Sequence, residues 1–400
     1  MKKKYSLLFA LTLMLIASAL TCLAFMLASC SQLFENRNNK NAAAGREFAA
    51  LLDAIEESYI GEYDLDEVTA AAMRALVEAL GDDWSYYLTP EEYRQYLNTS
   101  GNRFAGIGVS VELNEEAGGM IVLGVYKGSP AETAGILAGE VITAVDGESI
   151  AGYSLEEIRG LLARPLGESA LVTVLRLDGS VEEITVVYDL VFNDPISFEM
   201  LEGYIGYIDI ANFDGGTADS FNAAVDLLLE QGARALIFDV RANPGGMVYE
   251  VTEMLDYLLP EGEIFISVSR EGEEEITYSG PEMIDIPAVV LVNRHSYSAA
   301  EYFAAILMEY GYADVVGEHT TGKSRSQRTL MLPNGGALHI STHQYLTKNR
   351  VALYDIGGLT PDYEINMTDE EYSAFVTGML DKNDDPHIRW AIALIMEKNI

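Results

Sequence analysis

Two apolar runs, 235–240 and 286–292, most constrain the fold, because each has the length and composition of a buried strand. The first run follows a strand-like stretch at 204–210 and an amphipathic stretch at 220–229. The second run leads into residues 299–309, whose apolar side chains recur at helical spacing. Strands that alternate with helices along the chain predict an α/β core with helices packed on its sheet.

Ser298 lies where the second apolar run turns into the predicted helix. The free amides and the dipole of a helix N-terminus favour a developing negative charge, which suits a serine nucleophile. The commonest role of a serine at this position is a plain N-cap, so the position alone leaves both interpretations open. Gly245 and Gly246 follow the first run, and their N–H groups can approach an oxyanion because no Cβ blocks them. A simple turn is the alternative for this pair.

Lys323 fits two incompatible chemistries. Residues 317–324 match the phosphate-loop pattern GxxxxGK[ST], but such a loop must open a helix. The next residues, 325–332 and 337–345, flank an Asn-Gly turn and predict a β-hairpin instead. The other interpretation makes Lys323 the base for Ser298. It requires that burial lower the lysine pKa by about 3–5 units from ~10.4.

In their order along the chain, these segments resemble the C-terminal processing (tail-specific) proteases, which are serine peptidases of family S41. The resemblance covers most of residues 45–368. It implies an α/β catalytic core of crotonase/ClpP-like ββα units. The motifs that carry it are Asp239-Val240-Arg241-Ala242-Asn243-Pro244-Gly245-Gly246, Ser296-Tyr297-Ser298-Ala299-Ala300-Glu301, Gly317 to Lys323, and Gln327.

No cofactor or metal is expected. His339 and His343 are spaced as HxxxH, but a strand would separate them by roughly 13 Å, too far for one metal. A serine-histidine arrangement with His319 as the base stays open as a variant. The residues that the resemblance implies are Ser298 as nucleophile, Lys323 as general base, Gln327 as the residue that orients the lysine, and Ala299 with Gly245 and Gly246 as oxyanion-hole amides.

Residues 103–188 change to short alternating strands separated by glycine turns. Gly106-Ile107-Gly108-Val109 and the segment 128–142 resemble a PDZ domain. Such a domain adds an extended peptide to a sheet edge, and the loop amides capture the terminal carboxylate. A bulge or tight turn is the alternative for the Gly-x-Gly pattern. Arg164 is the candidate contact that senses a bound tail.

The N-terminus has the pattern of an export signal. Lys2-Lys3-Lys4 precedes an apolar stretch from about Leu7 to Ala28. Leu27-Ala28-Ser29-Cys30 resembles a bacterial lipoprotein cleavage box with Cys30 lipidated. The apolar stretch exceeds the usual ~7–15 residues, so an uncleaved transmembrane anchor is the alternative. Both predict the extracytoplasmic face of a bacterial cell membrane.

Composition excludes some partners. The formal charge of −37, from 62 acidic and 25 basic residues, repels nucleic acid, so DNA or RNA binding is not expected. The two cysteines, Cys22 and Cys30, both lie in the N-terminal signal, so the exported part has none to form a disulfide.

The sequence thus predicts an exported serine endopeptidase that cleaves proteins through an acyl-enzyme and selects them by free, apolar C-termini. A homodimer is left open. A catalytically silent PDZ scaffold is the second hypothesis, and a phosphate-loop NTPase is the third. The expected parts are a signal or anchor (1–30), a flexible linker (31–44), a helical segment (45–102), the PDZ domain (103–188), the peptidase core (189–368) and a C-terminal helical segment (369–400).

Overall fold

The computed structural model describes residues 40–397, which belong to two compact units, 1–72 and 73–400. In the first unit, residues 40–58 are helical, and α2 (Leu65–Glu78) begins there and continues past its end. Cys30 and the predicted signal lie outside the described residues. Between residues 40 and 397, no helix is both long enough and apolar enough to cross a membrane.

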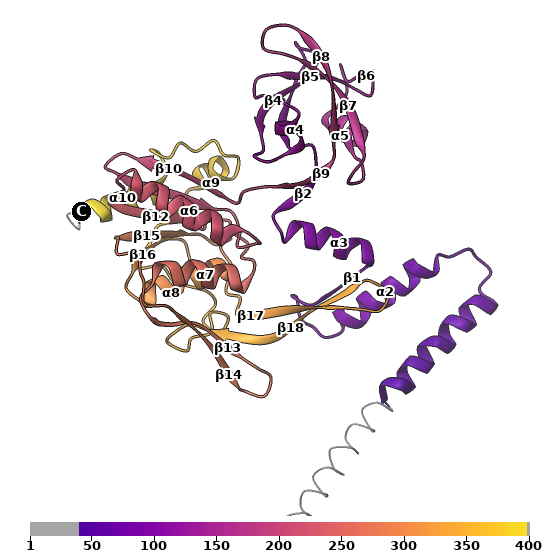
Figure 1. Cartoon of the computed structure of the whole chain (residues 1–400). Coiled ribbons are helices and arrows are strands. Elements are labelled where there is room, and N and C mark those ends of the chain that lie inside the picture. The colour runs from indigo at the N-terminus through magenta and orange to yellow at the C-terminus, as the bar shows by residue number, and fades with distance from the viewer. Residues whose placement is uncertain (1–39, 398–400) are drawn as a thin grey trace, which may run out of the picture. The chain divides into compact units, whose positions relative to one another are not determined.

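A six-stranded sheet forms the centre of the second unit (Figure 1). Five of its strands are parallel neighbours, and β10 adds to one edge in the antiparallel direction. The apolar runs of the sequence are two of its middle strands, which confirms the predicted α/β core. The strands, in spatial order, are β10 (Ile196–Leu201), β11 (Ile205–Ile210), β12 (Ala235–Asp239), β15 (Ala288–Val292), β16 (Ala313–Gly317) and β19 (Tyr363–Glu364).

Helices cover both faces of this sheet, because alternate strand residues point to opposite sides. Leu236 and Phe238 of β12 join one buried cluster with α6 (Thr217–Glu230), α7 (Val248–Leu258) and α8 (Ala299–Glu309). Ile237 joins a second cluster with α10 (Pro386–Glu397). The short helix α9 (Asp369–Val376) precedes α10. Burial on both faces explains why β12 and β15 read as continuous apolar runs.

A second sheet carries Lys323 at its border. β17 pairs with β18 in register from Arg325 opposite Gln344 to Met331 opposite Ala337. The predicted hairpin after Ser324 is therefore confirmed. A strand, and not a helix, begins directly after Ser324, so the segment lacks the helix N-terminus that a phosphate loop requires. The sheet consists of β1 (Tyr86–Leu88), β18 (Ala337–Leu346), β13 (Gly262–Val268) and β14 (Glu274–Ser279), with β17 (Arg325–Met331) on β18; α3 (Pro90–Thr99) follows β1.

A third sheet has its own buried core and lies within the predicted PDZ region. Its first strand, β3, pairs only with β4 and is an edge of the sheet. The flanking strands β2 (Arg103–Gly106) and β9 (Asp189–Phe192) pair with each other. The sheet comprises β3 (Val109–Asn114), β4 (Gly119–Val125), β5 (Val141–Val145), β6 (Glu148–Ser149), β7 (Ser169–Leu175) and β8 (Val181–Val187), with α4 (Pro130–Thr133) and α5 (Leu155–Leu162) beside it in sequence.

Candidate active site

Ser298 begins α8 with an unusual backbone. Its φ of 61° and ψ of −121° lie in a region that non-glycine residues rarely adopt and that costs about 1–3 kcal/mol. Such strain persists only where the surroundings enforce it, and it concentrates at functional sites. A serine that only capped the helix would not require this strained backbone, since an N-cap residue normally has extended backbone.

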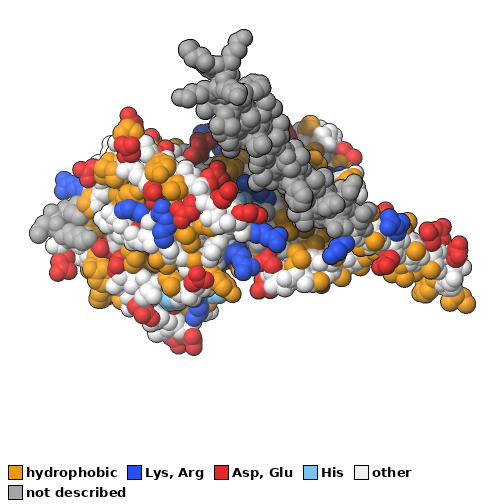
Figure 2. Space-filling view, turned by 90° about the horizontal axis from the view of Figure 1, so that it is seen from below, with side chains coloured by type: hydrophobic (Ala, Val, Ile, Leu, Met, Phe, Trp, Pro, Cys, Tyr) orange, Lys and Arg blue, Asp and Glu red, His pale blue; other side chains and the backbone are white. Residues whose placement is uncertain are grey.

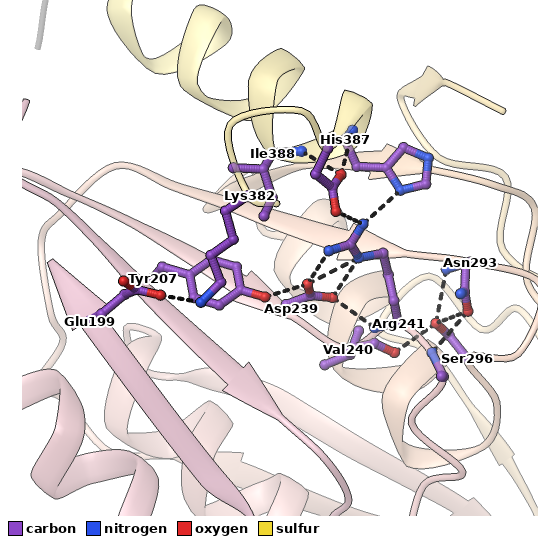
Figure 3. Close-up of polar contacts among 12 residues, drawn as sticks. Glu199, Tyr207, Asp239, Val240, Arg241, Asn293, Ser296, Lys382, His387 and Ile388 are labelled. Atoms are coloured by element: carbon purple, nitrogen blue, oxygen red, sulfur yellow. Dashed lines mark hydrogen bonds and ion pairs between the residues drawn. The ribbon is translucent and has the colours of Figure 1, made fainter. Parts of the chain in front are cut away.

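Buried hydrogen bonds fix the loop before Ser298 to the loop after β12. The Ser296 hydroxyl donates to the carbonyl O of Val240 at 2.7 Å, and the Asn293 carboxamide O accepts from the Ala242 amide at 2.9 Å. Figure 3 shows Ser296, Asn293 and Val240 together at this junction. The two loops are therefore held as one unit, although they are about fifty residues apart in the chain.

The Glu301 carboxylate connects Ser298 to the segment that contains Gly322 and Lys323. Its Oε2 accepts the amide of Ser298 at 2.8 Å and the amide of Lys323 at 3.0 Å. Its Oε1 accepts the amide of Gly322 at 2.6 Å and the hydroxyl of Thr320. Burial raises the pKa of this carboxyl, although the four donors oppose the rise. Its side chain thus sets the relative positions of Ser298 and Lys323.

The predicted oxyanion amides lie around Ser298. A Cβ on Gly245 would come within 2.8 Å of the Ser298 Cβ and 2.9 Å of the Ala299 amide N, so only glycine fits there. The Gly245 N–H is occupied, because it donates to the Asn243 side chain at 2.8 Å. The amides of Gly246 and Ala299 have no acceptor within residues 40–397. These two donors are therefore free to bind a developing oxyanion.

The Lys323 ammonium lies over the ring of Trp84, 4.2 Å from its centroid. Burial lowers the pKa of Lys323 to about 8, while the charges of Asp82 and Glu301 oppose the shift. A small neutral fraction is thus present at pH 7, as a general base requires. Asp239 does not act on Lys323, since its carboxylate pairs with Arg241.

Neither Ser298 nor Gln327 hydrogen-bonds to the Lys323 ammonium in the described residues. The Gln327 amide donates to the carbonyl O of Arg325 and to the Ser341 hydroxyl, both at 3.0 Å. The Tyr345 hydroxyl donates to the carbonyl O of Lys323 at 2.5 Å and lies beside the Ser298 side chain. The two predicted catalytic groups share one site without a direct bond.

A cleft of about 840 Å³ joins these groups. Ser298 and Lys323 line it together with the glycine pair, Ala299 and Gln327. The sequence did not single out several other lining residues. Among them are Trp84, Tyr297, His339 and Tyr345. Burial and the nearby Lys323 charge lower the pKa of His339 to about 4, so this imidazole is neutral at pH 7.

The other histidines near the motifs lie outside the cleft lining. The His319 ring bonds to the carbonyl O of Gly357 at 2.9 Å and to the Thr360 hydroxyl at 3.2 Å. His295 stacks on Tyr372, with ring centroids 5.7 Å apart. The serine-histidine variant with His319 as base has no geometric support here.

Arg241, just after β12, holds a buried charge network (Figure 3). Its guanidinium binds Asp239 at 2.5 Å and Asp385 at 2.7 Å. The His387 Nε2 must donate to the carbonyl O of Ile365 at 2.8 Å, so its Nδ1 accepts from Arg241 at 3.3 Å. Burial alone would raise the pKa of the Asp239 carboxyl, but the guanidinium holds it below its usual range. The C-terminal helix α10 is thereby anchored at the end of β12.

In the PDZ-like sheet, the Gly106-Ile107-Gly108 loop precedes the edge strand β3. The Ile107 carbonyl O accepts from the Ala131 amide at 2.8 Å, which fixes the loop. The amides of Ile107 and Gly108 have no acceptor in the described part of the chain. Arg164 pairs with Asp146 of the same sheet region.

Comparison with known protein families gives a match for the catalytic core and another for the PDZ region. The model of peptidase family S41 matches residues 204–365, and a PDZ domain model matches residues 121–176. The core of the chain is therefore similar to the serine-type peptidases of family S41. The chain is 28% identical over 372 residues to the carboxy-terminal processing protease CtpA of Bacillus subtilis, covering 92% of this chain and 79% of that protein.

Two further proteins are similar to this chain. A carboxyl-terminal-processing protease of Synechocystis is 29% identical over 302 residues, covering 74% of this chain and 70% of the relative. A Bacteroides fragilis structure assigned to the S41 proteases matches with a TM-score of 0.51 and 16% identity, over 85% of this chain and 98% of that one. At this identity the match supports the fold alone.

Proposed function

We propose that this protein is an exported, membrane-anchored endopeptidase of family S41 in which Ser298 is the nucleophile and Lys323 the general base. The observation that carries this proposal is the carboxylate of Glu301, which binds the backbone amides of both residues. The strained backbone of Ser298 supports the same role. The β10-β11-α6 order agrees with a crotonase/ClpP-like ββα unit in the core.

In the proposed reaction, neutral Lys323 takes the proton from the Ser298 hydroxyl as its Oγ attacks the scissile carbonyl carbon. The amides of Gly246 and Ala299 stabilise the oxyanion. Collapse breaks the C–N bond, and the lysine gives its proton to the leaving amine. Water then hydrolyses the ester on Ser298 by the same steps. The lysine side chain must move from the Trp84 ring toward Ser298 to begin.

The PDZ domain is proposed to select substrates by a free, apolar C-terminus. The edge of β3 supports addition of a peptide strand, and the free amides of Ile107 and Gly108 support carboxylate capture. A substrate with a free tail is expected to be cleaved several-fold faster than its C-terminally amidated twin. Equal kcat/KM for the two substrates would contradict tail recognition but would leave the proposed roles of Ser298 and Lys323 unaffected.

The anchor is proposed to be a lipid on Cys30 or a transmembrane segment before it. Both follow from the N-terminal signal pattern. Metabolic labelling of the expressed protein with a radioactive fatty acid distinguishes them. Label that is lost in Cys30→Ser supports the lipid. Absence of label, with the full-length protein still in the membrane fraction, supports the transmembrane segment.

Labelling with a fluorophosphonate tests the nucleophile directly. The fragment from Asn38 onward is expected to react at Ser298, with the adduct located by peptide mass spectrometry and absent in Ser298→Ala. A substrate tail peptide is included in a parallel sample. Labelling at a different serine, or none in either sample, would contradict the assignment of Ser298.

A further inference from the structure

Asp214 lies beside the segment 245–247, whose Gly246 amide is one of the proposed oxyanion donors. The Phe213 amide donates to the carbonyl O of Gly245 at 2.8 Å, and the Met247 amide donates to the carbonyl O of Phe213 at 2.7 Å. A Cβ on Gly246 would come within 2.8 Å of the Asp214 amide N. Asp214 also lines the cleft that contains Ser298. Asp214 therefore lies in the same cleft as Ser298, beside the segment that carries the Gly246 amide.

The Asp214 carboxylate has no hydrogen bond and no ion pair with any residue between 40 and 397. Helix α6 does not use it as a cap, because Glu250 accepts the amides of Gly216 and Ala218, each at 2.7 Å. Burial, and then the like charge of Glu250, raise the pKa of Asp214 to about 6. A half-buried carboxylate without a cation is costly, so a structural role does not explain it.

The cleft's basic residues are occupied elsewhere. The Lys323 ammonium lies over Trp84, and Arg325 pairs with Asp82 at 3.1 Å. Beside Asp214 stands instead the phenol ring of Tyr249, which is 55% exposed and also lines the cleft. The two are neighbours, since a Cβ on Gly215, the residue after Asp214, would lie 3.5 Å from the Tyr249 hydroxyl. A carboxylate beside an exposed aromatic face suits an organic cation.

We propose that Asp214 and Tyr249 form a subsite for a lysine or arginine side chain of the substrate, within two residues of the cleaved bond. The proposal rests on the proposed function, because it assumes that the peptide is cleaved at Ser298. An extended peptide advances roughly 3.3 Å per residue, so the residues on either side of the scissile bond lie along the cleft that Asp214 lines. The carboxylate gains its missing cation only when substrate is bound.

The test uses peptides that share one C-terminal tail and differ at a single position. Lysine or norleucine is placed at each of the two positions on either side of the cleaved bond, and kcat/KM is measured. The wild-type enzyme is expected to prefer lysine at one position by about tenfold, the size of a partly exposed charge-assisted hydrogen bond. Asp214→Asn should abolish this preference, by lowering kcat/KM for the lysine peptide about tenfold more than for the norleucine peptide.

Asp219→Asn is the matched control, because Asp219 lies exposed on α6 and outside the cleft lining. It removes the same charge and should keep the preference. Asp214→Lys should reverse it, so that a glutamate peptide is cleaved faster than the lysine peptide. The wild-type preference should fall as the pH drops through about 6, since Asp214 is then protonated. Titration of Lys323 changes both rates equally and cancels in the ratio, while Glu250 and Tyr249 are the other titratable groups that face Asp214.

Two results overturn the proposal in distinguishable ways. If the wild-type enzyme cleaves both peptides without preference, or Asp214→Asn keeps the preference, the subsite is wrong and the proposed function stands. If the wild-type enzyme cleaves neither peptide and takes no fluorophosphonate at Ser298, the proposed function fails and the subsite fails with it.

Discussion

The two proposed catalytic residues are positioned by opposite means. The backbone of Ser298 is strained and is fixed by Glu301 and by buried hydrogen bonds of the preceding loop. The Lys323 side chain is buried and lies against the ring of Trp84, and its ammonium makes no hydrogen bond in the described residues. A nucleophile needs exact placement, whereas a lysine base needs a low pKa, which hydrogen-bonding acids would raise. The difference indicates that the site fixes the geometry of one residue and the pKa of the other.

The largest expected effect comes from removing either residue. Ser298→Ala and Lys323→Ala should each lower kcat/KM by about 10³-fold or more. Lys323→Arg should be equally inactive, because arginine stays protonated. Steady-state hydrolysis of a tailed peptide measures this, with thermal melting as a control for folding. Substantial activity in Lys323→Ala would show that Lys323 is not the general base.

Glu301→Gln tests whether one carboxylate positions both loops. A carboxamide keeps the shape but replaces one acceptor oxygen by a donor, which leaves two donors unpaired at about 1–3 kcal/mol each. We expect kcat to fall by about 10²-fold and the melting temperature to drop.

Glu309→Gln is the matched control on the same helix. Glu309 accepts from the Thr347 hydroxyl at 2.6 Å and the Asn349 amide at 2.9 Å, far along α8 from Ser298. It should lower the melting temperature with little change in kcat. Similar loss of kcat in both variants would mean that Glu301 acts only through stability.

Trp84→Ala tests whether burial by this ring lowers the pKa of Lys323. The wild-type kcat/KM should rise with pH through about 8, because Lys323 is neutral above its pKa. Removing the ring exposes the ammonium to water and also removes the attraction between the cation and the ring. We expect the exposure to dominate and to move the midpoint toward 10.5. A shift of one unit lowers the rate at pH 7 by about tenfold. Trp84→Phe keeps the burial and should keep the midpoint. An unchanged profile in Trp84→Ala would show that burial by this ring does not lower the lysine pKa.

The smallest effect is expected for Gln327→Ala. Its amide binds Arg325 and Ser341 and leaves the lysine unbound, so the loss in kcat/KM should stay below about tenfold. A loss comparable to that of Lys323→Ala would show that Gln327 contacts the lysine during the reaction.

The sequence predicted the elements that local patterns determine. The buried strands β12 and β15, helix α8 and the β17-β18 hairpin agree with their apolar spacing and turn residues. Contacts between distant segments were not predictable. Trp84 precedes Lys323 by more than two hundred residues, and no local pattern indicates that its ring covers the ammonium. Glu301 could have been found, since Ser-x-x-Glu is a capping pattern.

The chain enters and leaves the PDZ region through two strands, β2 and β9, that pair with each other. The Asn193 amide also donates to the carbonyl O of Asn102 at 2.7 Å. The two ends of the insertion are thus already adjacent, so excising it requires only a short bridging turn to close the chain. In evolutionary terms, this makes the inserted domain exchangeable: another domain with neighbouring termini could be spliced in without breaking a strand of the central sheet.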